Sequence, residues 1–333
     1  MNRIVSVIIP AFNADRTLER CMRSVLEQSY SEWEAILVDD GSIDKTAAMC
    51  DQYALLDNRV KVIHQPNRGV SAARNKGLEM ATGSFITFLD ADDELLPDAI
   101  DNLVKKALAV NADMIIGRMV GRGKNGIDVI ENTKTTDGLL TGDSFLELVL
   151  EDNPYCYGVY RILYKATFLD GMKFEAGRIV NEDSFFIFEC ALKKPTAAFI
   201  NNGVYRHSNN PYSVTHSGFS LKKYEDILYF LERKVEAIEV SRPVYREKMY
   251  NLLVKCHMNL LQNMCCTYGS EWRARKRFSI SEFEKYKSYF IPAIRQDRKM
   301  FFILSHNLYY AYCFLYFLRT KLINKGKFGG GNA

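Results

Sequence analysis

The sequence lacks the two glycine-rich fingerprints with which many α/β proteins bind nucleotides. No G-x-G-x-x-G follows the first apolar run, and the 333 residues contain no G-x-x-x-x-G-K-[ST]. These absences exclude a dinucleotide-binding fold of the usual kind and a P-loop nucleotidase. Any nucleotide that this chain uses would have to be bound by other groups at the ends of strands.

Paired cysteines and a signal-peptide pattern are also missing. None of the eight cysteines forms a C-x-x-C pair, and their spacing is irregular. In a chain of this length they are typical of reduced, mostly buried thiols, and a disulfide framework is not expected. Met1-Asn2-Arg3 leads directly into an apolar run that stops at Pro10, which is not the pattern of a secretory leader. We therefore expect a cytoplasmic protein.

A strong net charge is absent, because 44 Lys and Arg residues nearly balance 40 Asp and Glu residues to give +4. The charge is nevertheless uneven. Residues 271–333 hold thirteen basic and four acidic residues, a balance of +9, which leaves 4 − 9 = −5 for residues 1–270. A basic end behind an acidic body predicts an anionic partner, for which a membrane surface and nucleic acid are the candidates.

The first hundred residues alternate between strand and helix patterns. Four short apolar runs predict strands, at 4–9, 34–38, 60–64 and 85–89. Three stretches with helical spacing lie between them, at 14–28, 44–55 and 70–81. This alternation predicts a parallel sheet covered by helices on both faces, and the ligands of such sheets bind beyond the carboxyl ends of the strands.

The most informative segment is Asp90-Ala91-Asp92-Asp93, which follows the predicted strand 85–89. Three carboxylates within four residues repel one another unless a cation or a positive group lies among them. Hard oxygen ligands favour Mg²⁺ or Mn²⁺, and these ions usually bridge protein carboxylates to substrate phosphates. The alternative is a solvated acidic turn in front of a helix that starts near Pro97.

Two other strand ends carry polar segments. Pro10-Ala11-Phe12-Asn13 follows the first predicted strand, and Asp39-Asp40-Gly41-Ser42 follows the second. Asp40 has the chemistry to accept a hydrogen bond from a base N–H or a ribose hydroxyl, although an Asp in D-G-S also caps turns. A third segment, Arg68 to Asn75, places Arg74 in the first turns of a predicted helix, where anions are favoured. An ordinary helix start with solvated arginines is the alternative there.

These segments together resemble the family 2 glycosyltransferases, which are inverting enzymes of the GT-A fold that use nucleotide-activated sugars. Four motifs match in order and at normal spacing over residues 4–97. The resemblance implies that Asp90 contacts the nucleotide sugar, that Asp92 coordinates Mn²⁺ or Mg²⁺ on the diphosphate, and that Arg74 lies near the donor phosphates or sugar. It also assigns to the nucleotide-sugar site Pro10, Ala11, Phe12, Asn13, Asp40 and Ala91.

The second half of the chain supplies a candidate general base. Asn181-Glu182-Asp183-Ser184 precedes an apolar helical run, 185–192, and resembles the E-D motif of the family, with Asp183 as the base. An inverting transfer is a single displacement in which such a carboxylate takes the proton of the acceptor hydroxyl. Without the other motifs, the pair would be interpreted as a helix start whose charges suit the helix dipole.

A polar and aromatic segment at 204–215 is rich in turn formers and predicts a loop. The family often has a Y-R segment here that closes over the donor. The resemblance therefore makes Arg206 a donor-binding residue and His207 a metal ligand. A connector with no ligand role is the alternative.

Residues 219–333 lose the strand pattern and predict long helices. Residues 301–318 are nearly all apolar or aromatic, and four cations follow them up to Lys327. A helix that spans a membrane needs ~20 apolar residues, and this run is shorter and rich in Tyr. We therefore expect residues 301–327 to lie on an anionic membrane surface. A buried helix packed on the catalytic domain is the alternative.

The sequence thus predicts a GT-A α/β sheet covered by helices. Nucleotide-sugar binding is expected in residues 1–105, acceptor binding and the base in 106–218, and a helical extension in 219–333. The expected activity is metal-dependent, inverting transfer of a sugar from a UDP-sugar to a hydroxyl of a glycan, at the inner face of the cell membrane.

 The acceptor is expected to be a lipid-linked glycan of a bacterial surface polysaccharide. A GDP- or dTDP-sugar donor and a catalytically silent scaffold that binds sugar nucleotides are the alternatives. The carboxylate-rich strand ends argue against a nucleic-acid partner, and the oligomeric state is left open.

Overall fold

The structure, a computed structural model, describes residues 3–122, 128–130, 138–151, 158–208, 220–250 and 252–253. The chain forms two compact units, residues 1–217 and residues 218–333. The predicted membrane-surface segment 301–327 lies outside the described residues. Within the described ranges, no helix combines the length and the hydropathy that crossing a membrane requires.

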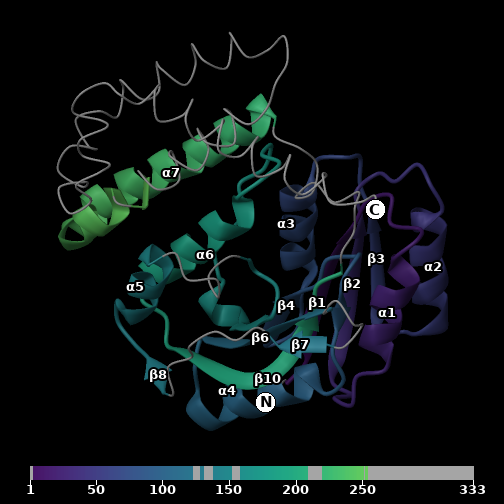
Figure 1. Ribbon diagram of the computed structural model, residues 1–333. Helices are drawn as coiled ribbons and strands as arrows, with labels where there is room; N and C mark the ends of the chain where they lie inside the picture. The colour runs from purple at the N-terminus through teal and green to yellow at the C-terminus, as the bar shows by residue number, and fades with distance from the viewer. Residues whose placement is uncertain are drawn as a thin grey trace, which may run out of the picture. The chain divides into compact units, whose positions relative to one another are not determined.

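The first unit contains ten strands and six α-helices among its described residues (Figure 1). The strands are β1 Val5–Ala11, β2 Trp33–Asp39, β3 Val60–His64, β4 Phe85–Phe88, β5 Glu94–Leu95, β6 Met114–Arg122, β7 Asp128–Ile130, β8 Leu139–Leu140, β9 Ile162–Lys165 and β10 Ala197–Arg206. The helices are α1 Leu18–Leu26, α2 Thr46–Leu56, α3 Val70–Met80, α4 Ala99–Val110, α5 Ser144–Leu150 and α6 Glu182–Leu192. In the second unit, α7 spans Leu221–Ser241.

All ten strands belong to one sheet with the order β3-β2-β1-β4-β9-β6-β10-β5, and β7 and β8 pair with β6 and β10. The strands β3, β2, β1 and β4 run parallel, as predicted. In contrast, β9 runs antiparallel to both of its neighbours, β4 and β6. The parallel half and the mixed half of the sheet therefore meet at β4. Ligands of open α/β sheets bind beyond the carboxyl ends of the strands where the strand order reverses, which here is between β1 and β4.

Helices cover both faces of the sheet. On one face, α1 and α4 share one buried core with the alternate residues of β1 and β2 that include Ile9, and α4 packs on β6, β9 and β10. On the other face, α3 approaches β1 so closely that a Cβ on Gly77 would lie 2.3 Å from Ile8 Cγ2, so glycine is required there. The same face is covered by α6, whose Phe186 packs edge-on against Phe88 of β4.

The helix α1 has the predicted buried face but a later start. Its buried residues are Leu18, Cys21, Met22 and Val25. The helix begins at Leu18 and not at Ala14, since the Ala14 N–H donates a hydrogen bond to Thr46 Oγ1 at 2.7 Å. The segment between β1 and α1 is therefore held to the start of α2.

A buried carboxylate joins the strands at the amino-terminal edge of the sheet, opposite the predicted site. Glu34 of β2 accepts hydrogen bonds at Oε1 from Ser6 Oγ at 2.6 Å and from Thr82 N at 2.7 Å. Lys61 Nζ of β3 lies 2.6 Å from Glu34 Oε2. Burial raises the pKa of Glu34, but the hydrogen bonds from Lys61, Ser6 and Thr82 outweigh it and lower the pKa from 4.5 to about 2. The ionised carboxylate therefore stabilises the fold.

Glu34→Gln should lower the free energy of unfolding at pH 7 by on the order of 3 kcal/mol, the value of a pKa shift of this size. Because the folded-state pKa lies below the unfolded-state pKa, the stabilisation is complete above about pH 4.5 and is lost as the pH falls toward 2. Urea unfolding should show a gap between the two proteins at pH 7 that narrows by pH 3.

The control for this substitution is Glu79→Gln on the exposed surface of α3. An exposed ion pair contributes little, so the control should change the free energy of unfolding by less than about 0.5 kcal/mol. A gap between wild type and Glu34→Gln that is as wide at pH 3 as at pH 7 would contradict the prediction.

Candidate active site

The loops that follow β1 and β2 are joined at the carboxyl edge of the sheet. Asn13 N donates to Ser42 Oγ at 3.0 Å, and Asn13 Oδ1 accepts from Ile43 N at 3.0 Å. Gly41 has a φ of +75°, and a Cβ there would lie 2.7 Å from Asn67 N, so the turn requires glycine. The two predicted segments therefore form one surface.

Asp40 is buried beneath this surface. Its Oδ1 accepts hydrogen bonds from Gln65 Nε2 at 2.7 Å and from Arg68 N at 2.9 Å. Its Oδ2 accepts one from Gly69 N at 2.8 Å. The carboxylate thus fixes the loop between β3 and α3. Its predicted contact with a nucleoside stays a prediction, and such a contact would use the remaining lone pairs of the carboxylate.

The first segment exposes one aromatic side chain. Pro10 and Ala11 are buried as the last residues of β1, whereas the Phe12 side chain beyond them is 49% exposed. A ring in this position offers an apolar face on which a base can stack. Phe12 is therefore the aromatic side chain of this segment that a ligand can reach.

Arg74 of α3 lies under the site and not on its surface. Its side chain is 4% exposed, its Nη2 lies 2.9 Å from Asp90 Oδ1, and its Nη1 lies 3.0 Å from Glu182 Oε1. Burial lowers the pKa of Arg74, but the charges of Asp90 and Glu182 outweigh it and raise the pKa, so the guanidinium stays charged. Arg74 therefore joins the turn after β4 to the first turn of α6. The predicted contact with donor phosphates stays a prediction.

Asp183, the predicted base, lies in the first turn of α6. The residue before this helix, Asn181, has a left-handed φ of 68°, which Asn tolerates better than most residues. Asp183 Oδ1 accepts a hydrogen bond from Ser184 N at 2.7 Å. Burial and the charge of Glu182 raise the pKa of Asp183 to about 7, although Arg74 and the Ser184 N–H oppose the rise. A carboxylate with such a pKa is suited to accept a proton at neutral pH.

Asn75 makes a second connection from α3 to the chain before α6, and the sequence analysis did not predict this contact. Its Nδ2 donates to Phe174 O at 2.8 Å, and its Oδ1 accepts from Phe174 N at 2.7 Å. Phe174 in turn stacks on Phe186 of α6, with 4.0 Å between the ring centroids. No sequence pattern links residues 99 positions apart. The placement of α6 and of Asp183 thus depends on two adjacent residues of α3.

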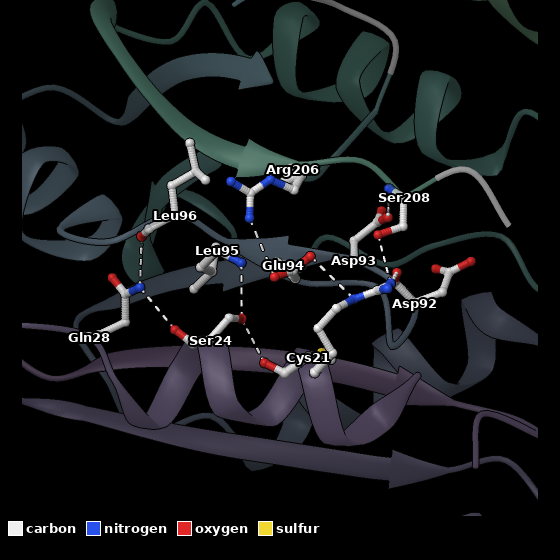
Figure 2. A network of polar contacts seen from close by, with 11 residues as sticks. Cys21, Ser24, Gln28, Asp92, Asp93, Glu94, Leu95, Leu96, Arg206 and Ser208 are labelled. Atoms are coloured by element: carbon white, nitrogen blue, oxygen red, sulfur yellow. Dashed lines mark hydrogen bonds and ion pairs between the residues drawn. The ribbon is translucent and has the colours of Figure 1, made fainter. Parts of the chain in front are cut away.

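The three carboxylates that follow β4 have three different surroundings. Asp90 holds the ion pair described above. Asp93 is buried and accepts hydrogen bonds from Tyr205 Oη at 2.6 Å and from Ser208 N at 2.7 Å. Burial, and then the charge of Asp90, raises the pKa of Asp93 to about 8. Asp92 is partly exposed, and Figure 2 shows its carboxylate directed away from Asp93 and Ser208.

The predicted donor-binding and metal-binding residues at the end of β10 lie beside the same turn. Arg206 is the register partner of Glu94 in the antiparallel pair of β10 and β5, and its Nη1 lies 3.4 Å from Glu94 Oε2. His207 is the next residue and is partly exposed. The residue after it, Ser208, binds Asp93. A donor contact of Arg206 and a metal contact of His207 stay predictions.

Asp92 fits a hard divalent cation by its ligand chemistry. Carboxylate oxygens suit Mg²⁺ and Mn²⁺, and one or two protein carboxylates suffice when substrate phosphates supply the other oxygens. In the part of the chain that the structure describes, no group of three or more His, Cys, Asp and Glu side chains could hold a metal ion. A cation at this turn would therefore need oxygens from a ligand to complete its coordination.

Comparisons with known proteins show which family and which solved structures this chain resembles. Residues 6–167 match the family described as Glycosyl transferase family 2. The chain is 28% identical over 278 residues to glycosyltransferase GlyG of Streptococcus pneumoniae, a match that covers 76% of this chain and 87% of GlyG. It is 26% identical over 226 residues to Escherichia coli WfgD, a UDP-Glc:alpha-D-GlcNAc-diphosphoundecaprenol beta-1,3-glucosyltransferase, covering 67% of this chain and 82% of WfgD.

A solved structure shares the fold. The crystal structure of S. aureus TarS 1-349 in complex with UDP matches with a TM-score of 0.68 and 16% sequence identity, over 92% of this chain and 91% of that chain. At this identity the likeness concerns the fold alone, and it confirms the predicted GT-A sheet covered by helices. The segments at the ends of β1, β2 and β4 and the start of α3 all lie within residues 6–167. This chain belongs to family 2 of the glycosyltransferases.

Proposed function

We propose that this protein transfers a sugar from a UDP-sugar to a hydroxyl of a glycan, with inversion at the anomeric carbon. The observation that carries the proposal is the pairing of Arg74 with both Asp90 and Glu182. A single displacement requires the donor and the base to be held in one geometry. In this proposal Asp90 contacts the donor, and Glu182 is the residue next to the base Asp183. The buried guanidinium of Arg74 joins Asp90 to Glu182.

Asp183 is the base of the proposed reaction. The acceptor oxygen forms a bond to the anomeric carbon while the bond from that carbon to the diphosphate oxygen breaks, and the hydroxyl proton passes to Asp183. A pKa of about 7 supports this role, because a large share of Asp183 is ionised at neutral pH and is still basic. A divalent cation, when bound, stabilises the charge that develops on the departing diphosphate.

The UDP-sugar donor is supported by two comparisons and by the site. UDP occupies the TarS structure, and the name of WfgD specifies UDP-glucose. The exposed ring of Phe12 supports stacking of a base at the edge of the sheet. A GDP- or dTDP-sugar is the alternative donor. A silent scaffold is disfavoured because the chain retains both Asp92 and Asp183.

The proposed acceptor is a lipid-linked glycan of a surface polysaccharide. The relative WfgD supports this choice, since its name describes a diphosphoundecaprenol acceptor. Such an acceptor would place the enzyme beside the inner face of the cell membrane. The basic residues of 301–327 support the same position on sequence grounds, because each Lys or Arg near an anionic surface contributes roughly 1 kcal/mol to binding.

A panel of nucleotide sugars tests the proposed activity. In the presence of Mn²⁺, one or more UDP-sugars should raise the Tm of the full chain and be hydrolysed slowly to UDP. If only a GDP- or dTDP-sugar stabilises the protein, that sugar nucleotide is the donor in place of a UDP-sugar, and the proposed transfer reaction still holds. Stabilisation without any hydrolysis or transfer would favour the scaffold and overturn the proposed function.

Asp92→Asn should reduce transfer by about 10²-fold or more and weaken cation-dependent donor binding, because it removes the proposed ligand of the cation that stabilises the leaving group. Chelation of the wild-type protein with EDTA should have a similar effect. Initial rates over a range of Mn²⁺ concentrations measure both. Asp98→Asn, which changes an exposed carboxylate directly before α4, is the control and should behave as wild type. Full turnover in EDTA, or by Asp92→Asn, would reject the metal role.

A further inference from the structure

Two polar side chains of the α1 segment hold the main chain that follows the Asp-rich turn (Figure 2). Ser24 Oγ accepts a hydrogen bond from Leu95 N at 3.1 Å, and Gln28 Nε2 donates one to Leu96 O at 2.8 Å. Gln28 Oε1 also accepts from Ile100 N at 3.1 Å. Gln28 is buried, so these bonds form away from solvent. Together they fix the path of the chain through β5 to the start of α4.

Arg20 lies one turn before Ser24 on the same side of α1, and it reaches the turn itself. Its Nη2 lies 2.7 Å from both Asp92 O and Ser208 Oγ. Its Nε lies 3.2 Å from Glu94 Oε1. One guanidinium thus binds the main chain of the proposed metal ligand and a side chain that follows β10. The planar, fixed donors of Arg suit such a multiple contact, whereas the single ammonium of Lys does not.

The Asp-rich turn needs a support of this kind. Asp90 and Asp92 bring two carboxylates together beside the buried Asp93, and repulsion between ionised carboxylates opposes a single fixed conformation. Arg20 contributes a positive charge at this turn. It also binds the hydroxyl of Ser208, whose backbone N–H donates to Asp93 at 2.7 Å. The turn and the chain after β10 are therefore held together through two independent contacts of one serine.

We propose that Arg20 is a positioning residue for the donor site. By holding Asp92 O and Ser208 Oγ, it sets the direction in which the Asp92 carboxylate faces the donor diphosphate and its cation. This inference rests on the proposed role of Asp92 in metal binding. Arg20 acts through Asp92 and contacts neither the donor nor the reacting atoms. Its loss therefore weakens cation-dependent nucleotide binding and leaves proton transfer to Asp183 unchanged.

Arg20→Met tests the inference, because it keeps most of the side-chain length and removes every donor. The probes are UDP, GDP and dTDP, each titrated calorimetrically into the full chain with and without Mn²⁺. For the nucleotide that the wild type binds, the Kd with Mn²⁺ should rise about ten-fold, as expected for the loss of a charge-assisted hydrogen bond. The Kd without Mn²⁺ and the pH profile of transfer should stay as in the wild type.

Further variants serve as comparisons. Arg23→Met changes an exposed Arg on the same helix and should leave the Kd unchanged. Ser208→Ala removes one of the Arg20 partners and should raise the Kd by less than Arg20→Met does. Because the two residues share one contact, the double variant should show less than the product of the single effects. If Arg20→Met does not fold, Ser208→Ala and Arg20→Lys still test the inference, since both should raise the Kd of the nucleotide in the presence of Mn²⁺.

An unchanged Kd in Arg20→Met overturns the inference, even if its Tm falls, because Arg20 is then a packing residue. A Kd that rises equally with and without Mn²⁺ also overturns it. Asp92→Asn distinguishes a failure of this inference from a failure of the proposed function. If Asp92→Asn abolishes cation-dependent binding and Arg20→Met does not weaken it, this inference alone fails. If Asp92→Asn has no effect, or the wild type binds none of the three nucleotides, the metal assignment and this inference fail together.

Discussion

Asp183→Asn should reduce sugar transfer by at least about 10²-fold, while the Kd of the donor changes little. The amide keeps the shape of the side chain, and its oxygen can still accept the hydrogen bond from Ser184 N. It cannot take the proton of the acceptor hydroxyl. Initial rates of transfer and calorimetric donor binding separate the two effects. Asp170→Asn, an exposed carboxylate in the same unit, is the control and should leave both values unchanged.

The pH dependence of the transfer rate, compared between the wild type and Asp183→Asn, gives a second test of the role of Asp183 as the base. Because burial and Glu182 raise the pKa of Asp183 to about 7, the wild-type rate should fall about ten-fold for each pH unit below 7. A carboxylate with an ordinary pKa would give this fall only below about pH 4. The residual rate of Asp183→Asn should lack this acid limb. If the variant melts and donor binding collapses, Asp183 is a structural cap and the base lies elsewhere.

Stability should change in the opposite direction to activity. The fold favours the protonated form of Asp183, since its folded-state pKa is raised from 3.8 to about 7. Ionisation therefore destabilises the wild-type protein progressively from about pH 4 to pH 7. The uncharged amide of Asp183→Asn avoids this penalty. Its advantage in free energy of unfolding should grow over that interval and stay constant above it.

The parallel half of the fold was predictable because each of its elements carries its own periodic pattern. The run at 60–64 coincides with β3, and that at 85–89 ends one residue beyond β4. The helix predicted at 14–28 is shorter, because Ala14 bonds to Thr46, 32 positions later, and periodicity does not reveal such a contact. The strand β5 is two residues long and is defined by its pairing with β10, so no period marks it.

The candidate site was predictable where chemistry is concentrated in one short segment, as at Asp90 to Asp93. It was not predictable where a side chain leaves its own segment. An Arg near a helix start is expected to meet anions, and the family resemblance implies that Arg74 lies near the donor phosphates or sugar, which stays a prediction. What the sequence did not reveal is that Arg74 pairs with two carboxylates of the protein, one of which, Glu182, is 108 positions later. Arg20 likewise occupies an ordinary polar position of an amphipathic helix, and only the fold brings it to Asp92.

Arg74→Met should be the most damaging substitution in this site, for the fold and for the reaction. Removing one partner from a buried ion pair destabilises by about 3–5 kcal/mol, because the other charge stays buried. Here two carboxylates lose their partner, although the 30% exposure of the Asp90 side chain moderates the effect. Urea unfolding measures the loss. Arg68→Met, an exposed Arg of the same motif, is the control and should change stability by less than about 0.5 kcal/mol.

Arg74→Lys separates the charge of this residue from its geometry. An ammonium pairs well with one carboxylate at a time, so stability and transfer should lie between those of the wild type and Arg74→Met. The pH profile gives the sharper comparison. The charge of Arg74 lowers the pKa of Asp183 against the effect of burial, so its removal in Arg74→Met should move the acid limb above pH 7. Arg74→Lys retains the charge and should move it less. An acid limb at the same pH in all three proteins would show that the charge of Arg74 does not affect the pKa of Asp183. It would contradict the proposal that Arg74 links the donor-binding Asp90 to the base.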